Sequence, residues 1–426
     1  MKLFQQMLVA GATLGLLAPI AAQASDVINL EEMDSYSRSK STTSRLDNKT
    51  FINEVSEDIA NLKGRVDGLE VQQREFEAGG FSDTTTLDGK TIFAVGALEN
   101  ESGDLKEGTM FQYTYQMNLN TSFTGDDNLY VRLKSGNSVK NSSPFATSSA
   151  GSYLSSTNTN GDELKIDKIW YTFPIGDSNT VWIGPRIENY YMHGASPSIY
   201  SPTLKQFKLG GNGAAYGAST NTGIGWAYNA DNGFSISSNV VSKTAGATTG
   251  FLSDESATNW STQVAYTTDS YHVSLINALK YDWSDSYYST TLGKARVDNS
   301  TNYGLRGYWR PDDSGSAVPE ISAGYDISTV DGQSEDTSAY FVGLTWKDTF
   351  QADDKIGVAF GQPQTREDED SSPFTWEAYY SFKPNDSTEV RPTIFGYTDA
   401  TGDAAADGSK APFDYTGVVL ETTFKF

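Results

Sequence analysis

The stretch Phe111-Gln-Tyr-Thr-Tyr-Gln-Met-Asn-Leu-Asn-Thr-Ser-Phe123 alternates between apolar and polar residues along its length. Aromatic and aliphatic side chains take the odd-numbered positions, joined there by Thr121, and Gln, Thr, Asn and Ser take the even-numbered ones. Successive side chains of a β-strand point to opposite faces, so this period of two predicts a strand with one apolar and one polar face. About sixteen such segments follow one another from Thr91 to the C-terminal Phe426.

The connections between these segments alternate between short and long. Gly, Asp and Asn recur in the short ones, as tight turns require, and the longer ones are rich in Ser, Gly and Asp. Such alternation is expected of an up-and-down barrel with turns on one side of a membrane and loops on the other, and it is rare in soluble sandwiches. The predicted turns are Thr124–Asp127, Gly176–Ser178, Ala230–Asn232, Thr268–Ser270, Pro311–Ser316, Asp348–Asp353 and Pro384–Ser387, and the predicted loops lie near 136–161, 188–221, 243–258 and 281–300.

The predicted fold class is therefore all-β, a transmembrane antiparallel β-barrel of about sixteen strands over residues 81–426. The mean hydropathy is low, at -0.46, and no apolar run reaches the ~18 residues of a spanning helix. A barrel is compatible with both observations because its lipid-facing and water-facing residues alternate. Barrels of this size enclose a water-filled channel, so the pattern favours a transport function.

The N-terminus predicts export. Lys2, the apolar run Leu8–Leu17 and the small-residue motif Ala22–Ala24 are typical of a secretory signal peptide, which we expect to span residues 1–24. Residues 25–50 are polar and turn-rich and are interpreted as a linker. The chain has no cysteine, which fits an exported bacterial envelope protein and excludes disulfides and thiolate chemistry.

A helix is predicted over residues 51–78, ended by Gly79 and Gly80. Its apolar residues recur at alternating spacings of three and four, with Gln73 at the one missing position, which is the heptad seam of a coiled coil. A helix that packs on its own domain is the alternative, but the seam is narrow, so self-association is favoured. Both dimers and trimers fit the core residues, which are Ile52, Val55, Ile59, Leu62, Val66, Leu69 and Phe76.

Composition and motifs argue against several other functions. The net charge of -23 opposes nucleic-acid binding, which needs a basic surface. The two histidines, His193 and His272, are far apart in sequence and belong to no catalytic or metal-ligand motif. The run Gly210–Gly213 precedes a strand and not a helix, so it does not predict a phosphate-binding loop. We therefore predict no enzyme activity, no cofactor and no metal.

Several blocks of sequence resemble one family, the cyanobacterial outer-membrane porins. They are the helix Asn61–Glu70 followed by Phe81–Ala94, and further on Val342–Asp348, Gly357–Pro363 and Glu377–Lys383. These porins are grouped with the carbohydrate-selective porins and are also labelled iron-uptake porins. The resemblance implies an outer-membrane barrel with a periplasmic N-terminal helix, a homotrimer embedded in outer-membrane lipids, and transport of small solutes, sugars or iron species.

The resemblance also implies two further features and lacks a third. The C-terminal Phe426, with Phe424, is expected to serve the barrel-assembly machinery. The third long loop, residues 188–221, is expected to fold inward and narrow the pore, where Lys205 and Lys208 outnumber its single acid, Glu188. Members of the family carry an S-layer-homology domain before the coiled coil, but residues 25–50 are too few for it, so the resemblance does not carry cell-wall anchoring to this chain.

Charged residues within the strands are expected to face the lumen, because a charge on the lipid face near the midplane costs about 2–4 kcal/mol. For Lys134, Lys280 and Arg310 an equal alternative is that the side chain reaches the interface from a strand end. The expected lumen acids are Asp326 and Glu377. The expected lumen bases are Arg132, Lys134, Arg186, Lys280, Arg306, Arg310 and Arg391.

The predicted function is passive diffusion of small hydrophilic solutes and inorganic ions, filtered by size and by charge at the constriction. We expect the constriction to be positive and to tolerate anions such as phosphate, nitrate or bicarbonate. The alternative is a structural or adhesive barrel that tethers the outer membrane and conducts little.

Overall fold

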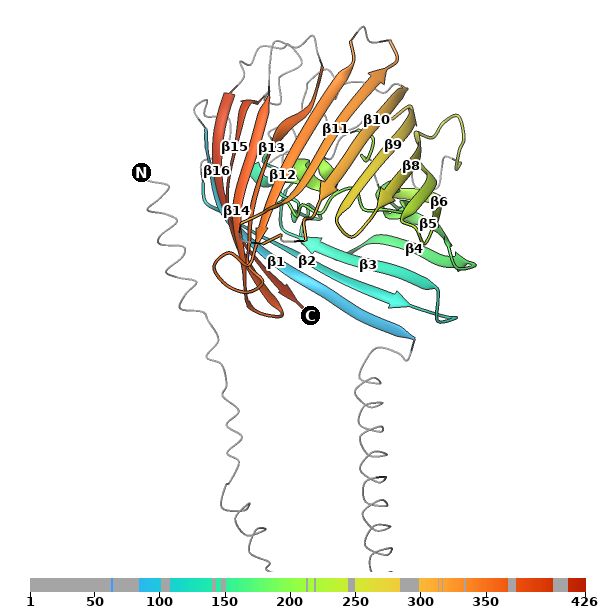
Figure 1. Cartoon of the computed structure of the whole chain (residues 1–426), viewed down its shortest axis with the longest axis horizontal. Coiled ribbons are helices and arrows are strands. Elements are labelled where there is room, and N and C mark those ends of the chain that lie inside the picture. Colours follow the sequence, from blue (N-terminus) through green and yellow to red (C-terminus); the bar gives the residue numbers. More distant parts are fainter. Residues whose placement is uncertain are drawn as a thin grey trace, which may run out of the picture. The chain divides into compact units, whose positions relative to one another are not determined.

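A closed antiparallel barrel forms the body of the protein. The computed structural model describes Lys63 and residues 84–426, except for 101–107, 140–142, 147–150, 212–213, 218–219, 244–249, 284–298, 313, 316, 333–334, 367–372 and 401–412. Within this part, sixteen strands each pair with their neighbours in sequence, and β1 pairs with β16 to close the sheet (Figure 1). The predicted fold class is confirmed.

The strands are β1 (Thr85–Asn100), β2 (Met110–Thr121), β3 (Asn128–Gly136), β4 (Lys165–Ile175), β5 (Asn179–Ile187), β6 (Asn221–Asn229), β7 (Phe234–Ser242), β8 (Thr258–Thr267), β9 (Tyr271–Tyr281), β10 (Ser300–Trp309), β11 (Glu320–Val330), β12 (Thr337–Lys347), β13 (Lys355–Arg366), β14 (Phe374–Asn385), β15 (Thr388–Ala400) and β16 (Phe413–Lys425). The predicted turns and loops all lie at the junctions between these strands, on alternate sides as expected. Connection length alternates between short and long as far as β10, but the β10–β11 connection (310–319) is longer than the β11–β12 connection (331–336), and the two that follow (348–354 and 367–373) are equally long.

The N-terminal predictions lie outside the described residues. They are the signal peptide (1–24), the linker (25–50) and the coiled coil (51–78), of which only Lys63, in a helical conformation, is described. No helix in the described part of the chain is both long enough and apolar enough to cross a membrane.

Burial along β9 shows how the sheet is oriented. Tyr271, Val273 and Leu275 on one face are each about half exposed, whereas His272 and Ser274 on the other face are buried. A soluble barrel would bury its apolar face, but here the apolar face points outward and the polar face points into the lumen. This inverted pattern is the arrangement that a lipid bilayer requires.

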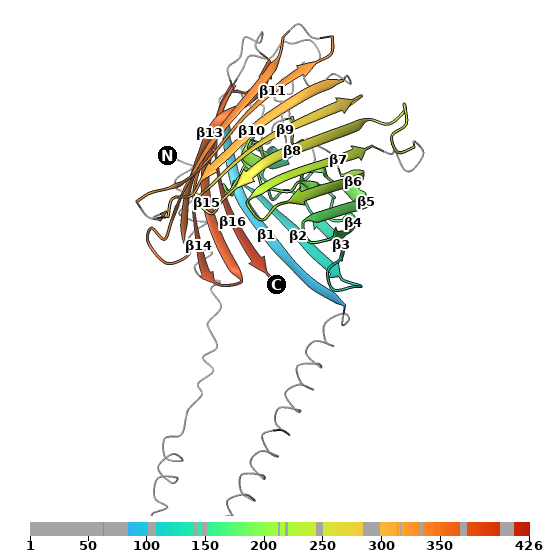
Figure 2. The ribbon, with the colours of Figure 1, turned by 45° about the vertical axis from the view of Figure 1, so that its right-hand side comes forward.

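The barrel closes where β16 meets β1, and Figure 2 shows these two strands side by side. The Phe93 and Phe424 rings lie 5.6 Å apart on the outer face, and Phe426 stacks on Tyr115 at 5.9 Å. The backbone of Phe426 also exchanges two hydrogen bonds with Gly89. The C-terminal aromatic residues therefore lie on the outside of the seam that completes the barrel.

Two turns on the same side of the barrel share a sequence pattern and a set of hydrogen bonds. Ser122-Phe-Thr-Gly-Asp-Asp127 joins β2 to β3, and Thr349-Phe-Gln-Ala-Asp-Asp354 joins β12 to β13. In each, the final Asp accepts hydrogen bonds from backbone N–H groups of the turn and from a Tyr hydroxyl of the strand beyond, Tyr171 at 2.6 Å or Tyr380 at 3.0 Å.

These hydrogen bonds shift the acidity of both turn carboxyls. The Tyr171 hydroxyl and the N–H and hydroxyl of Thr124 hold the pKa of Asp127 far below its ordinary value, although partial burial opposes them. Burial alone would raise the pKa of Asp354, but the backbone N–H groups that it accepts from outweigh burial and lower it. Each turn is therefore stabilised by an ionised carboxylate.

Candidate functional site

The β5–β6 loop, residues 188–220, folds into the barrel, as the family resemblance implies. Its 3₁₀ turn η4 (Asn189–Met192) packs against β5–β7, and its 3₁₀ turn η5 (Lys205–Gly210) packs against β11–β13. Between them, Ala195 exchanges two hydrogen bonds with the Gln263 side chain of β8. The loop therefore crosses the lumen and is attached to strands far from those that carry it.

Glu377 of β14 is one anchor for this loop. Its fully buried carboxylate accepts hydrogen bonds from the Tyr200 hydroxyl at 2.9 Å and from the backbone N–H groups of Thr203 and Leu204 at 3.1 and 2.7 Å. Glu377, predicted as a lumen acid, lies on the inner face of β14, but the loop covers its carboxylate, which therefore anchors the loop.

Arg306 of β10 and Asp326 of β11 form a second anchor. They make a two-bonded ion pair at 2.9 and 2.7 Å, and both side chains are buried. The Arg306 Nε also donates to the carbonyl of Leu209 at 3.0 Å, and the guanidinium lies 5.1 Å from the Tyr216 ring. Both side chains lie on the inner face of the barrel, where η5 and the residues after it cover the pair.

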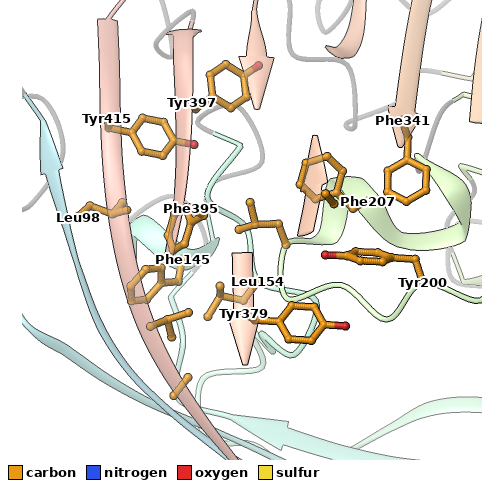
Figure 3. Close-up of a cluster of buried hydrophobic side chains, with 14 residues drawn as sticks. Leu98, Phe145, Leu154, Tyr200, Phe207, Phe341, Tyr379, Phe395, Tyr397 and Tyr415 are labelled. Atoms are coloured by element: carbon orange, nitrogen blue, oxygen red, sulfur yellow. The ribbon is translucent and has the colours of Figure 1, made fainter. Parts of the chain in front are cut away.

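An apolar cluster fills the space between the loops and the wall. Figure 3 shows Tyr200, Phe207 and Phe341 together on one side of it and Phe145 with Phe395 on the other. This cluster is a small hydrophobic core inside the barrel, lined mainly by β12–β16 and β1. It packs the β5–β6 loop and Phe145 against that side of the barrel wall.

A second loop, which the sequence analysis did not identify as part of the pore, also folds inward. In the β3–β4 loop, residues 137–164, Phe145 and Leu154 are completely buried. Leu154 forms an isolated antiparallel bridge with Leu204 of the β5–β6 loop, with backbone hydrogen bonds of 2.7 and 2.8 Å on either side. The two loops are therefore joined to each other inside the barrel.

A cavity of about 740 Å³ lies on the opposite side of these loops. Strands β1–β4 form one wall, and the two inner loops form the other. Among the described residues that line it, six side chains are basic and two are acidic, so the local charge opposes the strongly negative charge of the whole chain. The bases are Lys90, Arg132, Lys134, Lys168, Lys205 and Lys208, and the acids are Asp167 and Glu188.

Each of the two acids in the cavity is paired with a base. Arg132 donates from Nε to Asp167 at 2.6 Å and from Nη1 to the Tyr191 hydroxyl at 3.1 Å. Lys168 pairs with Glu188 at 2.5 Å and donates to Thr220 at 2.9 Å. Neutralising these pairs still leaves a surplus of basic side chains along the wall.

The predicted lysines of the β5–β6 loop lie in this cavity. The Lys205 Nζ is 4.5 Å from the centre of the Tyr153 ring, which joins it to the β3–β4 loop, and the Lys208 Nζ is 5.7 Å from the Tyr190 ring. Lys134 of β3 also lines the cavity and lies within electrostatic range of both lysines. Arg132, Lys205 and Lys208 thus line the same cavity.

Arg186 and Arg391 lie elsewhere. A β-bulge between Gly184 and Ile187 adds a residue to β5, so Arg186 leaves the lumen face and is exposed, with its Nε 3.4 Å from the Asp167 carbonyl. Its predicted lumen position is wrong for this reason. Arg391 is inside the barrel, but it bonds to the Ser201 carbonyl at 3.1 Å and to Glu389 at 2.8 Å, so it is another loop anchor and does not line the cavity.

Lys280 and Arg310, each expected either in the lumen or at a strand end, lie in different environments. Lys280 of β9 is buried on the inner face, whereas Arg310 follows β10 and pairs with Glu320 at the turn. No group of three or more His, Cys, Asp or Glu that could bind a metal occurs in the described ranges.

Sequence reasoning missed Lys90, Asp167, Lys168 and an aromatic row beside them. Tyr130 lies 4.3 Å from Trp170, which lies 5.0 Å from Tyr191, which lies 4.6 Å from Tyr190, measured between ring centres. Alternation places Tyr130 on the same face of β3 as Arg132, but Asp167 and Lys168 are consecutive residues of β4 that both line the cavity, because a register shift opposite Arg132 interrupts the alternation there. The position of Tyr190 and Tyr191 depends on the loop, which no local pattern specifies.

Two uncharacterized proteins are similar to this chain in sequence. Over 424 residues, the chain is 26% identical to an uncharacterized protein of Nostoc sp., covering 88% of this chain and 71% of that protein. It is 31% identical over 143 residues to an uncharacterized protein of Synechocystis sp., covering 32% of this chain and 25% of that protein.

Solved porins share the fold. A loop-deletion mutant of OmpT, an outer-membrane protein of Vibrio cholerae, superimposes with a TM-score of 0.53 at 12% identity, covering 80% of this chain and 99% of that one. A mutant of the Rhodopseudomonas blastica porin gives 0.50 at 11% identity, covering 80% and 100%. The family model described as carbohydrate-selective porin, OprB family, matches residues 46–395. The chain therefore belongs to the OprB family of carbohydrate-selective porins.

Proposed function

We propose that this porin is a passive diffusion channel for small hydrophilic solutes that favours anions, such as phosphate, nitrate or bicarbonate, at its constriction. The observation that carries the proposal is the composition of the cavity wall, where the lining bases outnumber the acids six to two in the described part of the chain. A permeating ion loses much of its water at a constriction, so charges there act more strongly than surface charges, which salt screens within about 8 Å.

Reversal potentials across a planar bilayer test this proposal. In a tenfold KCl gradient we expect a reversal potential on the anion side. Changing both Lys205 and Lys208 to Glu replaces two positive charges of the cavity wall with two negative ones and should move the reversal potential toward cations. Lys383→Glu is a control with the same type of charge change, because Lys383 pairs with Asp353 near a turn and does not line the cavity. No shift in the double variant would contradict the proposal, and no conductance would favour a structural tether.

We further propose that the protein is a homotrimer in outer-membrane lipids, held together by the helix of residues 51–78, and that Phe424 and Phe426 are read by the barrel-assembly machinery. One OmpT structure with the same fold is described as a trimer form, at 13% identity and a TM-score of 0.50. Polar replacements of Ile59, Leu62 and Val66 should reduce the mass measured in detergent to that of a monomer. A monomeric unmodified protein would contradict this assembly.

A further inference from the structure

We propose that Gly324 of β11 sets how far Lys208 projects into the cavity, so that this glycine is a positioning residue for the ion selectivity of the channel. The proposal rests on the proposed function, because it takes the cavity to be the conduction path. It goes further by giving a role in selectivity to a residue of the wall that carries no charge and does not itself line the cavity.

Lys208 belongs to a tight turn at the end of η5. The backbone N–H of Gly211 donates to the Lys208 carbonyl at 3.2 Å, and Leu209, Gly210 and Gly211 all have positive φ angles, of 59°, 74° and 124°. Leu209 carries a Cβ atom, so it keeps this left-handed conformation only where its surroundings hold it there. Lys208 and Leu209 line the cavity, whereas Gly210 is buried. The exposed side of the turn therefore carries the charge.

Two glycines meet on the buried side of the turn. A Cβ atom at Gly324 would lie 2.0 Å from the Gly210 carbonyl oxygen, whereas real Cβ atoms keep at least 3.0 Å from such neighbours. The backbone of the loop thus lies directly on the backbone of β11, at a distance that only glycine permits.

A side chain at position 324 would displace the loop. The clash could be relieved only by a movement of about 1.0 Å, which is the difference between 3.0 and 2.0 Å. Gly324 pairs with Arg306 of β10 on one side and with Phe341 of β12 on the other, so its strand is held by both neighbours. The turn of the loop has no such ladder, and we therefore expect the turn to move.

Arg306 holds the same turn from a second direction. Its Nε donates to the Leu209 carbonyl at 3.0 Å, and its Cδ would lie 2.9 Å from a Cβ at Gly324 and 2.6 Å from a Cβ at Gly210. The guanidinium is itself fixed by its ion pair with Asp326. Because the wall side of the turn is filled in this way, a displacement carries the turn toward the lumen, and Lys208 moves with it.

Moving Lys208 toward the lumen should strengthen the preference for anions. The attraction between a lysine and a permeating anion grows as their separation falls, and it is stronger in a narrow, partly dehydrated passage than in bulk water. We expect Gly324→Ala to lower the single-channel conductance and to raise the anion-to-cation permeability ratio about twofold. A purely structural role for Gly324 predicts lower stability and no change in this ratio.

Reversal potentials in a tenfold KCl gradient test the proposal on the full-length protein. They are measured for the unmodified channel, for Gly324→Ala, for Lys208→Gln and for the double variant. We expect Gly324→Ala to shift the reversal potential further to the anion side when Lys208 is present and to have no effect in the Lys208→Gln background.

Gly361→Ala is the matched control. A Cβ at Gly361 of β13 would lie 2.1 Å from the Tyr340 carbonyl oxygen, which is as close a contact as the one at Gly324, but the atoms nearest to it belong to β12 and not to the loop. This variant should lower the melting temperature without shifting the reversal potential.

A second variant approaches the contact from the loop. If Gly324→Ala does not fold, Gly210→Ala replaces it, because its added Cβ would meet the Cδ of the Arg306 side chain at 2.6 Å and leaves the strands unchanged. The same shift toward anions is expected, again only when Lys208 is present.

The outcomes separate this inference from the proposed function. No shift, a shift toward cations, or an equal shift in the Lys208→Gln background overturns the role of Gly324 and leaves the anion channel intact. An unmodified channel that reverses on the cation side overturns the proposed function, while a Lys208-dependent shift in Gly324→Ala would still support the positioning role. No conductance overturns both.

Discussion

The two sides of the β5–β6 loop meet opposite environments within one barrel. Toward β10–β15, the loop is fixed by buried ion pairs and hydrogen bonds and by an apolar core. Toward β1–β4 it faces a cavity lined by bases and tyrosines. The same class of inward-facing charge therefore has two roles: Arg306 and Glu377 hold the loop, whereas Arg132 faces the solute. Facing the lumen of a barrel does not by itself place a residue in its pore.

The largest effect should come from unbalancing the buried pair on the packed side. Arg306→Met leaves Asp326 buried without its partner, and loss of one member of a buried pair costs about 3–5 kcal/mol in the free energy of unfolding. The double change Arg306→Met with Asp326→Leu removes both charges and should recover most of this loss. Urea unfolding of the folded barrel in detergent measures both. Equal loss in the single and double variants would show that the pair is not what anchors the loop.

A smaller effect, on the anion-to-cation permeability ratio, is expected when Arg132 is replaced and not when Arg186 is replaced. Arg132→Gln removes one positive charge and leaves Asp167 unpaired in the cavity, so the anion-to-cation permeability ratio should fall about two- to fivefold, or about 0.4–1 kcal/mol. Arg186→Gln is the matched control, because the bulge in β5 turns Arg186 out of the lumen. Reversal potentials measure both, and an equal shift in the two variants would contradict this placement of the cavity.

The smallest effect, a change in acid stability, is expected to be the same for two turns, one toward each side of the β5–β6 loop. Asp127 lies on the turn between β2 and β3, and Asp354 lies on the turn between β12 and β13. Their pKa values are lower in the folded barrel than in the unfolded chain, so their stabilisation is complete above about pH 4 and is lost as the pH falls below it. Asp127→Asn and Asp354→Asn should each reduce this acid sensitivity slightly.

Thermal unfolding at pH 3 and pH 7 measures the acid effect. The difference in melting temperature between the two pH values should be smaller in each variant than in the unmodified protein. A difference that changes in only one variant would mean that the two turns, despite their shared sequence, contribute unequally.

Local patterns predicted the fold because each strand and turn is encoded locally. The alternation in Phe111–Phe123 is visible in the sequence, and so is each turn, because strand period and turn chemistry involve only neighbouring residues. At Arg186 the alternation of inward and outward side chains no longer predicts the face, since one extra residue in a bulge moves the next side chain to the other face. Nothing in the local sequence of β5 distinguishes such a bulge from regular strand.

The site was less predictable because it depends on where loops go. Lys205 and Lys208 were found through the family resemblance, not through any periodicity. The inward path of the β3–β4 loop rests on Phe145 and Leu154, two ordinary apolar residues whose partners lie on β15 and on another loop. Long-range pairs of this kind leave no signal in a single sequence, which is why Glu377 could be placed in the lumen but not under the loop.

Ser156, in the loop after the third strand, bonds to Glu421 in the last strand, across 265 residues. Phe145 of the same loop packs on Phe395 of β15. Both contacts of this inward-folded loop are therefore made with β15 and β16, the last strands of the barrel. The same strands that close the sheet also hold the loop that narrows the lumen, so a change that loosens the closing strands should loosen that loop as well.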